Sequence, residues 1–292
     1  MANQEIPKLI IVSPCYNEEA ILRYSADTLT SFLKRVIALG KIAPSSRILY
    51  VNDGSRDRTW SLIEELHKDN SSVEGLSLAK NVGSELAVMA GMMVARERAD
   101  VVVTIDADLQ DDVEAIEEMI NHYLAGCDIV YGVKTSREAD PWLKRITAEG
   151  FYRLQQNMGI NVIFNHTNFR LMSKRALEAL SEYSERNLYL RGIIPQLGFR
   201  SAEVEDVIRE RTAGESKYNY TKLLLLAVDG ITSFSTKPIS FIVGMGLFSL
   251  LISIVMAIYV LVSYVEHLSV PGWASLMLSL WFIGSMLLLS IG

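Results

Sequence analysis

The 292-residue sequence has few of the residues that mark a disulfide-rich protein or a zinc site. Its two cysteines, Cys15 and Cys127, are too few for a disulfide framework and fit a reducing compartment. The four histidines are scattered along the chain without the spacing of zinc ligands. The net charge of −6 argues against a protein that binds nucleic acid.

Several sequence signals of other protein classes are also missing. The chain has no G-x-G-x-x-G and no Walker A loop, which argues against dinucleotide binding and P-loop chemistry. The segment from Met1 to Lys8 is short and polar and lacks the apolar core of a signal peptide. We therefore expect the first 235 residues to lie in the cytoplasm.

Charged residues are absent from residues 239–265, a run longer than the roughly 20 residues that span a bilayer. A second apolar run, residues 273–292, follows the turn at Pro271 and Gly272. These runs predict two transmembrane helices, and a pair of buried core helices is the alternative. Lys217, Lys222 and Lys237 precede the first run, which favours a cytoplasmic N-terminal domain. Because no polar anchor follows the second run, we expect a C-terminal tail beyond Gly292.

The first half of the chain alternates apolar runs with segments of helical periodicity. We expect strands at residues 9–13, 47–53, 76–78, 101–106 and 129–132, with helices at 18–39, after 54 and at 84–96. This alternation predicts an α/β domain with a parallel, doubly wound sheet. Such sheets bind ligands at the carboxyl ends of their strands. Three polar clusters fall at those ends: residues 14–18, 53–55 and 106–108.

The strand at 101–106 leads into Asp106, Asp108 and Gln110, which alternate with apolar residues. An extended segment would aim all three side chains to one side. Two carboxylates and an amide oxygen are ligands that suit Mg²⁺ or Mn²⁺. The alternative is a strand that ends in a solvated acidic turn, since Asp111 and Asp112 follow.

Four tracts, in order, resemble one enzyme family: residues 14–19 (PCYNEE), 51–57 (VNDGSRD), 80–83 (KNVG) and 106–111 (DADLQD). The later tracts 168–172, 190–192 and 211–218 and the terminal pair of apolar runs agree. The chain thus resembles the inverting GT-A glycosyltransferases that load a sugar onto polyprenyl phosphate. These include dolichol-phosphate mannose synthase and the bactoprenol glucosyltransferases of the GtrB type. The resemblance implies a GT-A catalytic domain, which is Rossmann-like with a doubly wound, mostly parallel sheet, followed by a transmembrane hairpin.

The resemblance assigns three domains and a set of site residues. The domains are a cytoplasmic GT-A domain (1–216), juxtamembrane interfacial helices (217–238) and two transmembrane helices (239–292), with a buried core helix as the alternative for 217–238. Asp106, Asp108 and Gln110 would hold Mg²⁺ or Mn²⁺. The catalytic residues would be Asp108, Asn168 and Arg170. The nucleotide sugar would contact Pro14, Tyr16, Glu18, Asp53, Lys80, Asp106 and Lys217. Lys217 would lie on a mobile loop that closes over the diphosphate, and the alternative for this segment is a solvated surface turn.

Four basic residues are candidates for the acceptor phosphate: Lys134, Arg145, Arg170 and Arg191. Any one of these residues could instead be an ordinary cation on the protein surface. We therefore expect only that at least two of the four cluster at the site. One residue departs from the family pattern, which carries Asp where this chain has Asn168. A neutral amide is no general base, but a phosphate monoester with a second pKa near 6 needs positioning more than deprotonation. We expect Asn168 to orient the acceptor and Arg170 to pair with charge, with an inactivating change at position 168 as the alternative.

The expected function is transfer of a hexose, glucose from UDP-glucose, to undecaprenyl phosphate. The reaction would be a metal-dependent inverting single displacement at the cytoplasmic face of the bacterial inner membrane. Alternatives are a transferase for mannose, an aminoarabinose-type sugar or an N-acetylhexosamine, and a catalytically weak membrane scaffold. A processive synthase is disfavoured because no Gln-x-x-Arg-Trp tract is present. The resemblance also admits a homotetramer, a flippase partner and a downstream transferase.

Overall fold

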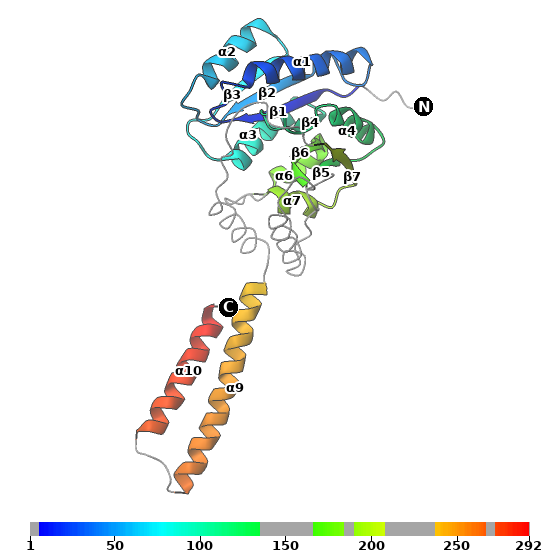
Figure 1. Cartoon of the computed structure of the whole chain (residues 1–292). Helices are drawn as coiled ribbons and strands as arrows, with labels where there is room; N and C mark the ends of the chain where they lie inside the picture. The colour runs from blue at the N-terminus through cyan, green and yellow to red at the C-terminus, as the bar shows by residue number, and fades with distance from the viewer. Residues whose placement is uncertain (1–5, 135–165, 184–189, 208–236, 267–271, 292) are drawn as a thin grey trace. The chain divides into compact units, whose positions relative to one another are not determined.

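The computed structural model describes residues 6–134, 166–183, 190–207, 237–266 and 272–291. These residues form two compact units, one up to residue 207 and one from residue 237 (Figure 1). Arg145, Lys217, the tract 211–218 and nearly all of the segment 217–238 lie outside the described residues. The roles expected for them stay predictions.

The described part of the first unit contains a seven-stranded sheet in the order β3-β2-β1-β4-β6-β5-β7. The strands are β1 (Leu9–Cys15), β2 (Arg47–Asn52), β3 (Val73–Ser77), β4 (Val101–Thr104), β5 (Ile129–Lys134), β6 (His166–Ser173) and β7 (Ser201–Asp206). The pairs β1–β2, β2–β3, β1–β4 and β5–β7 are parallel. Strand β6 runs antiparallel to both of its neighbours, β4 and β5. The expected mostly parallel sheet is therefore confirmed, and β6 departs from the parallel order that the alternation predicted.

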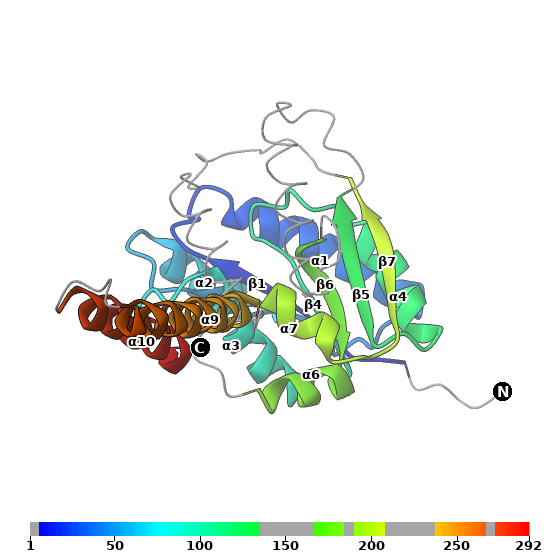
Figure 2. The ribbon, with the colours of Figure 1, turned by 90° about the horizontal axis from the view of Figure 1, so that it is seen from below.

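Helices cover both faces of this sheet. They are α1 (Leu22–Ala38), α2 (Thr59–Asp69), α3 (Ser84–Arg96), α4 (Ala115–Leu124), α6 (Lys174–Ser181) and α7 (Leu190–Gln196). Figure 1 shows α1 and α2 above the sheet and α3, α6 and α7 below it, and Figure 2 looks onto the lower face. With both faces covered, the central strands β1 and β4 are apolar runs rather than alternating ones, as in buried parallel sheets.

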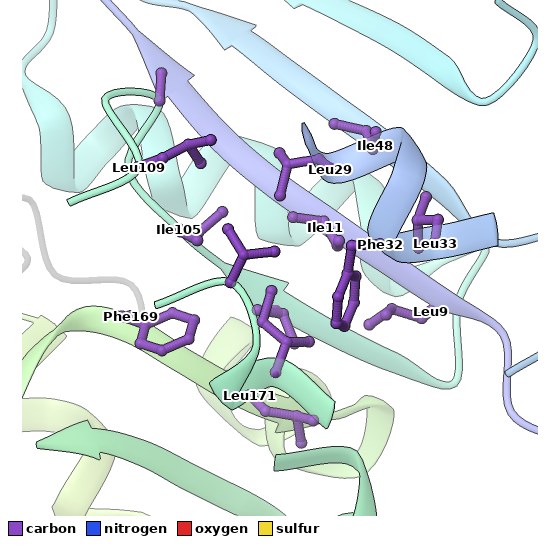
Figure 3. Close-up of a cluster of buried hydrophobic side chains, with 14 of the residues drawn as sticks. Leu9, Ile11, Leu29, Phe32, Leu33, Ile48, Ile105, Leu109, Phe169 and Leu171 are labelled. Carbon is purple, nitrogen blue, oxygen red and sulfur yellow. The ribbon is translucent and has the colours of Figure 1, made fainter. Parts of the chain in front are cut away.

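A cluster of buried apolar side chains lies between the sheet and the helices α1, α2 and α4 (Figure 3). Helix α1 contributes Leu29, Phe32 and Leu33, which point toward Leu9 and Ile11 of β1. Their spacing of three and four residues places them on one face of the helix. The helical periodicity predicted for this segment is confirmed, and its buried apolar face packs α1 against the sheet.

Each of the five expected strands has a boundary that differs from expectation by one to three residues, and two further strands were not predicted. Strand β3 begins at Val73 instead of residue 76, and its Gly75 leaves room for Ile63 and Trp60 of α2. Strand β4 ends at Thr104, two residues before the expected end, because the chain turns there. Strand β5 continues past residue 132 to Lys134. Strands β6 and β7 were not predicted, because both carry polar residues that break an apolar run.

The second unit contains two apolar helices that pack against each other. They are α9 (Lys237–Val265) and α10 (Trp273–Ile291), and Gly246 of α9 lies against Leu289 of α10. In the described part of the chain, the segment Ile239–Ser263 of α9 is long and apolar enough to cross a membrane. The apolar segment of α10, Leu276–Ile291, is shorter. Many large side chains of both helices are exposed, so neither is the buried core helix of a soluble protein.

Helix α3 approaches the sheet closely at Gly91. A Cβ atom at this position would lie 2.4 Å from Val12 Cγ1 and 2.7 Å from Val51 Cγ2. We predict that Gly91→Val destabilises the protein by about 1–3 kcal/mol, because the added atoms overpack this contact. Thermal unfolding in detergent measures the effect. Ala90→Val is the matched control, since it adds a similar side chain at a half-buried position of the same helix. Equal melting temperatures for the two variants would contradict the prediction.

Candidate active site

The loops that follow β1 and β2 are held together by hydrogen bonds to backbone N–H groups. Asn17 has a positive φ of 54°, a conformation that Asn tolerates better than most residues. Its side-chain oxygen accepts from Arg56 N at 2.8 Å. Four further bonds join the loops: Asn17 N to Ser55 Oγ, Glu18 N to Thr59 Oγ1, Glu19 N to Asp57 Oδ2 and Arg58 N to Glu19 Oε2. The loops therefore form one rim, on which Pro14, Tyr16 and Glu18 are half-buried.

Asp53, directly after β2, is buried and holds the loop that precedes α3. Its carboxylate accepts from Val82 N at 2.7 Å, from Gly83 N at 3.0 Å and from Asn81 Nδ2 at 2.9 Å. Most of its hydrogen-bonding capacity is therefore used within the protein. Asp53 shapes the loop of residues 80–83, a role that the sequence did not predict. Lys80 in this loop is exposed.

The carboxylate segment after β4 is a turn and not an extended strand. Leu109 N donates to Asp106 O at 3.1 Å, and Leu109 has a positive φ of 50°. The Leu109 side chain is nevertheless buried in the core, which holds the turn in this conformation (Figure 3). The expectation that Asp106, Asp108 and Gln110 extend on one side of a strand is therefore wrong.

Asp106 lies where acidic and basic side chains from four segments converge. Its carboxyl is open to solvent, yet enough protein surrounds it that desolvation raises its pKa. The nearby Asp108 raises this pKa further, and Glu18 adds to the effect. Arg191 and Lys134 act in the opposite direction and lower it. The structure thus brings together five of the predicted site residues: Glu18, Asp106, Asp108, Lys134 and Arg191.

Asp111 and Asp206 form a buried acidic pair beside this cluster. Burial raises the pKa of Asp111 well above its usual range, and the nearby Asp106 and Asp206 raise it further. Asp206 ends β7 and accepts from Asp112 N at 2.9 Å. Lys134 lies opposite Asp206 in the β5–β7 register. The alternative of a solvated acidic turn is therefore wrong for Asp111.

Strand β6 brings Asn168 and Arg170 to the same edge of the sheet. Because β6 is antiparallel, its first half lies beside the carboxyl ends of β4 and β5, with Arg170 opposite Thr104 and Tyr131. Arg170 is only 1% exposed and donates to Asn168 Oδ1 at 3.1 Å. Desolvation, together with the nearby Arg191, lowers the pKa of Arg170 to about 10. Burial also raises the pKa of Tyr131 to about 12, with Arg170 opposing the shift.

Arg191 reaches this cluster from the first turn of α7. It is close enough to both Arg170 and Asp106 to shift their pKa values. Its Nε atom is buried and has no hydrogen-bond partner within the described residues. Two arginines within electrostatic reach of each other, one of them desolvated, form a concentration of positive charge that suits an anion with several oxygens.

The acidic turn fits a hard divalent cation. Within the described ranges, no group of three or more His, Cys, Asp and Glu side chains is arranged to hold a metal. Asp106 and Asp108 would therefore need oxygen ligands from Gln110, water or a bound phosphate, which is the pattern that Mg²⁺ favours. The repulsion between Asp106 and Asp108 is what a cation between them would relieve.

Sequence reasoning missed four polar residues at the site: Glu85, Tyr131, Asp111 and Asp206. Glu85, in the first turn of α3, accepts a hydrogen bond from Leu190 N at 3.0 Å and raises the pKa of Arg170. Three of the four come from elements whose contacts depend on the placement of β6, β7 and α7. Asp111 alone carried a signal, since it directly follows the carboxylate turn in the sequence.

The raised pKa of Asp111 predicts an unusual pH dependence of stability. The unfolded chain releases this proton near pH 3.9, whereas the folded protein holds it to higher pH. The contribution of Asp111 to the free energy of unfolding is therefore complete below pH 4 and is lost as the pH rises through the folded pKa. We expect Asp111→Asn to gain melting temperature relative to the parent protein between pH 4 and pH 8, measured in EDTA.

Asp57→Asn should show the opposite trend. Partial desolvation acts to raise the pKa of Asp57, but hydrogen bonds from the Thr59 side chain and from the backbone N–H groups of Thr59 and Glu19 outweigh it and lower the pKa. This contribution is present above the unfolded pKa and lost at lower pH. The loss of melting temperature in Asp57→Asn should therefore be larger at pH 7 than at pH 4. Parallel trends for the two variants would contradict both assignments.

Gly54 lies directly against the backbone of the loop of residues 80–83, so a side chain at position 54 would displace that loop. A Cβ atom on Gly54 would lie 2.5 Å from Asn81 N and 2.6 Å from the carbonyl carbon of Lys80, and its φ is +62°. We expect Gly54→Ala to displace this loop and to cost about 1–3 kcal/mol, because backbone atoms must move. Hydrogen exchange of residues 80–83 measures the displacement. Gly40→Ala, also at positive φ but in open space, is the control, and equal exchange would contradict the prediction.

Comparison with known proteins gives a consistent result. The family model described as glycosyl transferase family 2 matches residues 10–181. The chain is 47% identical over 289 residues to the uncharacterized glycosyltransferase YkoT of Bacillus subtilis, covering 99% of this chain and 86% of that protein. It is 38% identical to the bactoprenol glucosyl transferase of Shigella phage SfV, covering 98% of this chain and 91% of the relative.

Among solved structures, the chain resembles glucosyl-3-phosphoglycerate synthase from Mycobacterium tuberculosis with a TM-score of 0.47 and 14% identity. That match covers 78% of this chain and 79% of the other, and it is too distant to support an inference about ligands. The family model spans more than half of the sequence, including the two loops of the rim and the carboxylate turn. The chain belongs to glycosyl transferase family 2 and is a glycosyltransferase.

Proposed function

We propose that this glycosyltransferase moves glucose from UDP-glucose to a polyprenyl phosphate at the cytoplasmic face of a membrane. The observation that carries the proposal is the convergence at Asp106, where a pair of carboxylates lies within electrostatic reach of Arg191 and Lys134. One site therefore offers both a cation-binding turn and an anion-binding edge. The choice of glucose and of a polyprenyl phosphate is supported by relatives named bactoprenol glucosyl transferase, at 36–38% identity over 98% of this chain.

The donor nucleotide would lie on the rim formed by the loops after β1 and β2. Tyr16 offers an aromatic face to a base, and Glu18 offers a carboxylate to base N–H or ribose hydroxyl groups. Pro14 and Asp53 would act by shaping the rim, since most of the hydrogen-bonding capacity of the Asp53 carboxylate serves the loop of residues 80–83. The exposed Lys80, and Lys217 outside the described residues, would approach the diphosphate as counter-charges.

A divalent cation, Mg²⁺ or Mn²⁺, would be held by Asp106, Asp108 and Gln110. When bound, it supplies positive charge to the diphosphate that leaves with the nucleotide. The protein's own contribution is the turn at residues 106–109, which holds Asp106 and Asp108 close together despite their repulsion. Asp108 would thereby serve catalysis as part of the donor-holding turn.

The acceptor phosphate would bind at Arg170 and Arg191, with Lys134 nearby and Arg145 as a further candidate. A phosphate monoester has a second pKa near 6, so it is largely dianionic at neutral pH and is already a nucleophile. The two arginines would orient it toward the sugar, and their positive charge favours binding of the dianion. A single inverting displacement then needs no protein general base.

Asn168 serves this scheme by orienting Arg170. The hydrogen bond from Arg170 Nη2 to Asn168 Oδ1 fixes the guanidinium without neutralising it. The carbonyl oxygen of Asn168 in turn accepts from the Thr104 hydroxyl at the end of β4. Asn168 would thus be a positioning residue instead of the acceptor contact that the sequence suggested.

The second unit would anchor the enzyme in the bacterial inner membrane. Helix α9 would span the bilayer, and the shorter α10 would return across it to complete a two-span anchor. The lipid acceptor would then reach the catalytic unit from the membrane in which its tail is embedded. A homotetramer, a flippase partner and a downstream transferase stay predictions of the family resemblance.

The proposed reaction is tested by transfer of radiolabelled sugar to undecaprenyl phosphate in detergent. The purified full chain is incubated with a panel of UDP- and GDP-sugars, with Mn²⁺, with Mg²⁺ and with EDTA. We expect label in the lipid phase from UDP-glucose alone, reduced to background by EDTA and restored by added metal. Label from a different donor would correct the sugar, and label that survives EDTA would contradict the metal assignment. No label from any donor would favour a scaffold.

Asn168→Asp tests whether the site lacks a general base. The new carboxylate would pair with Arg170 and remove positive charge from the acceptor edge. We predict a KM for undecaprenyl phosphate raised about tenfold, the size expected for loss of one charge-assisted hydrogen bond, with no gain in kcat. A gain in kcat of about a hundredfold, the lower range for a general base, would contradict the scheme. Asn168→Ala is the companion variant, since it frees Arg170 without adding charge.

A further inference from the structure

Arg191 belongs to a helix that has little means of fixing its own position. Helix α7 contains seven residues, including Gly192 and an internal Pro195. A helix of this length is not stable alone in water, and its glycine and proline weaken it further. Leu190, Ile193 and Ile194 bury its apolar side against the rest of the unit. That burial sets the depth of the helix but does not by itself fix where its first turn points.

The first turn of α7 is held by a side chain from α3. Glu85 Oε2 accepts a hydrogen bond from Leu190 N at 3.0 Å, across 105 residues of sequence. Leu190 is buried, so this backbone N–H depends on a protein partner. Because Arg191 directly follows Leu190, the bond fixes the backbone from which the Arg191 side chain extends.

Glu85 also acts on the second arginine of the site. Its charge raises the pKa of Arg170 and so opposes the desolvation and the repulsion from Arg191 that lower it. Glu85 is half-buried, which makes this attraction stronger than it would be at a fully exposed position. One carboxylate therefore holds the backbone beside Arg191 and stabilises the charged form of Arg170.

The position of Glu85 is set from the donor side of the site. Helix α3 begins at Ser84, directly after Gly83, whose N–H donates to Asp53 at 3.0 Å. Asp53 directly follows β2 and belongs to the rim on which the nucleotide is proposed to bind. A continuous chain of contacts thus runs from Asp53, through the first turn of α3, to the first turn of α7.

We propose that Glu85 is a positioning residue for the acceptor phosphate, acting through Leu190 and Arg191. This proposal rests on the proposed function, which identifies the acceptor as a polyprenyl phosphate. By holding the backbone beside Arg191, Glu85 keeps that arginine within electrostatic reach of Arg170, so that both can act on a single phosphate. The donor rim is held by other contacts, so Glu85 should affect acceptor binding more than donor binding.

The test compares Glu85→Ala with Glu85→Gln in the full chain. Glutamine retains an oxygen that can accept from Leu190 N, whereas alanine does not. We expect Glu85→Ala to raise the KM for undecaprenyl phosphate about tenfold, consistent with one lost hydrogen bond, and to leave the KM for UDP-glucose within about twofold. In Glu85→Gln, the KM for undecaprenyl phosphate should return to near the value of the parent protein. Glu97→Ala, at the other end of α3, is the matched control.

Three kinetic outcomes would overturn the proposal. They are an unchanged acceptor KM in Glu85→Ala, equal changes in both KM values, and a Glu85→Gln variant as impaired as Glu85→Ala. The last would mean that Glu85 acts through its charge alone. Equal melting temperatures of the variants and the parent protein exclude a general loss of folding.

Hydrogen exchange separates a failure of this proposal from a failure of the proposed function. Amide exchange in the peptide that contains Leu190–Gln196 can be followed without any substrate. We expect faster exchange in Glu85→Ala, with protection regained in Glu85→Gln. If the parent protein transfers no sugar but this pattern holds, the proposed function fails and the positioning contact stands. Unchanged exchange in Glu85→Ala overturns the positioning role whatever the enzyme's activity.

Discussion

The carboxylate of Asp53 accepts hydrogen bonds from Asn81, Val82 and Gly83, and the rest of the site is arranged around that contact. It fixes the loop that ends in Gly83 and therefore the point at which α3 begins. Helix α3 can then lie close to β1 and β2 because Gly91 has no side chain. From this fixed helix, Glu85 reaches α7 and brings Arg191 into place. A buried carboxylate after one strand is thus linked, through α3, to the first turn of α7.

Acidic and basic groups lie on opposite sides of a small region at the sheet edge. On one side Asp108 raises the pKa of Asp106, and Asp106 raises the pKa of Asp111; on the other, Arg170 is desolvated near Arg191. The acidic cluster or the arginine pair alone would be unfavourable, because like charges lie close together in partly buried positions. The two sides attract each other, since Arg191 and Lys134 lower the pKa of Asp106. Such opposed shifts are common where a protein binds and transforms charged ligands.

The sequence was most informative where contacts are local or follow from parallel strands. Helix α3 spans the predicted residues 84–96, and the polar ends of β1, β2 and β4 meet at one edge, as the topology of a doubly wound sheet requires. The turn at Leu109 could not be read from the sequence, because Leu rarely adopts a positive φ and is held there by burial. The contacts of Arg170, Asp206 and Glu85 depend on β6, β7 and α7, whose placement no local pattern encodes.

The antiparallel direction of β6 has a consequence for how specificity is distributed along the chain. The donor rim and the carboxylate turn come from residues 14–110, whereas the cations proposed for the acceptor come from residues 134–191. Strand β6 lies between β4 and β5 in the reverse direction. Its first residues therefore lie at the same sheet edge as the carboxylate turn, although they come from a later part of the sequence. Most of the residues proposed for the two substrates thereby come from different stretches of the chain, with Lys217 on the donor side and the positioning residue Glu85 on the acceptor side as exceptions. Such modularity lets one stretch diverge toward a new acceptor while the other retains the same donor.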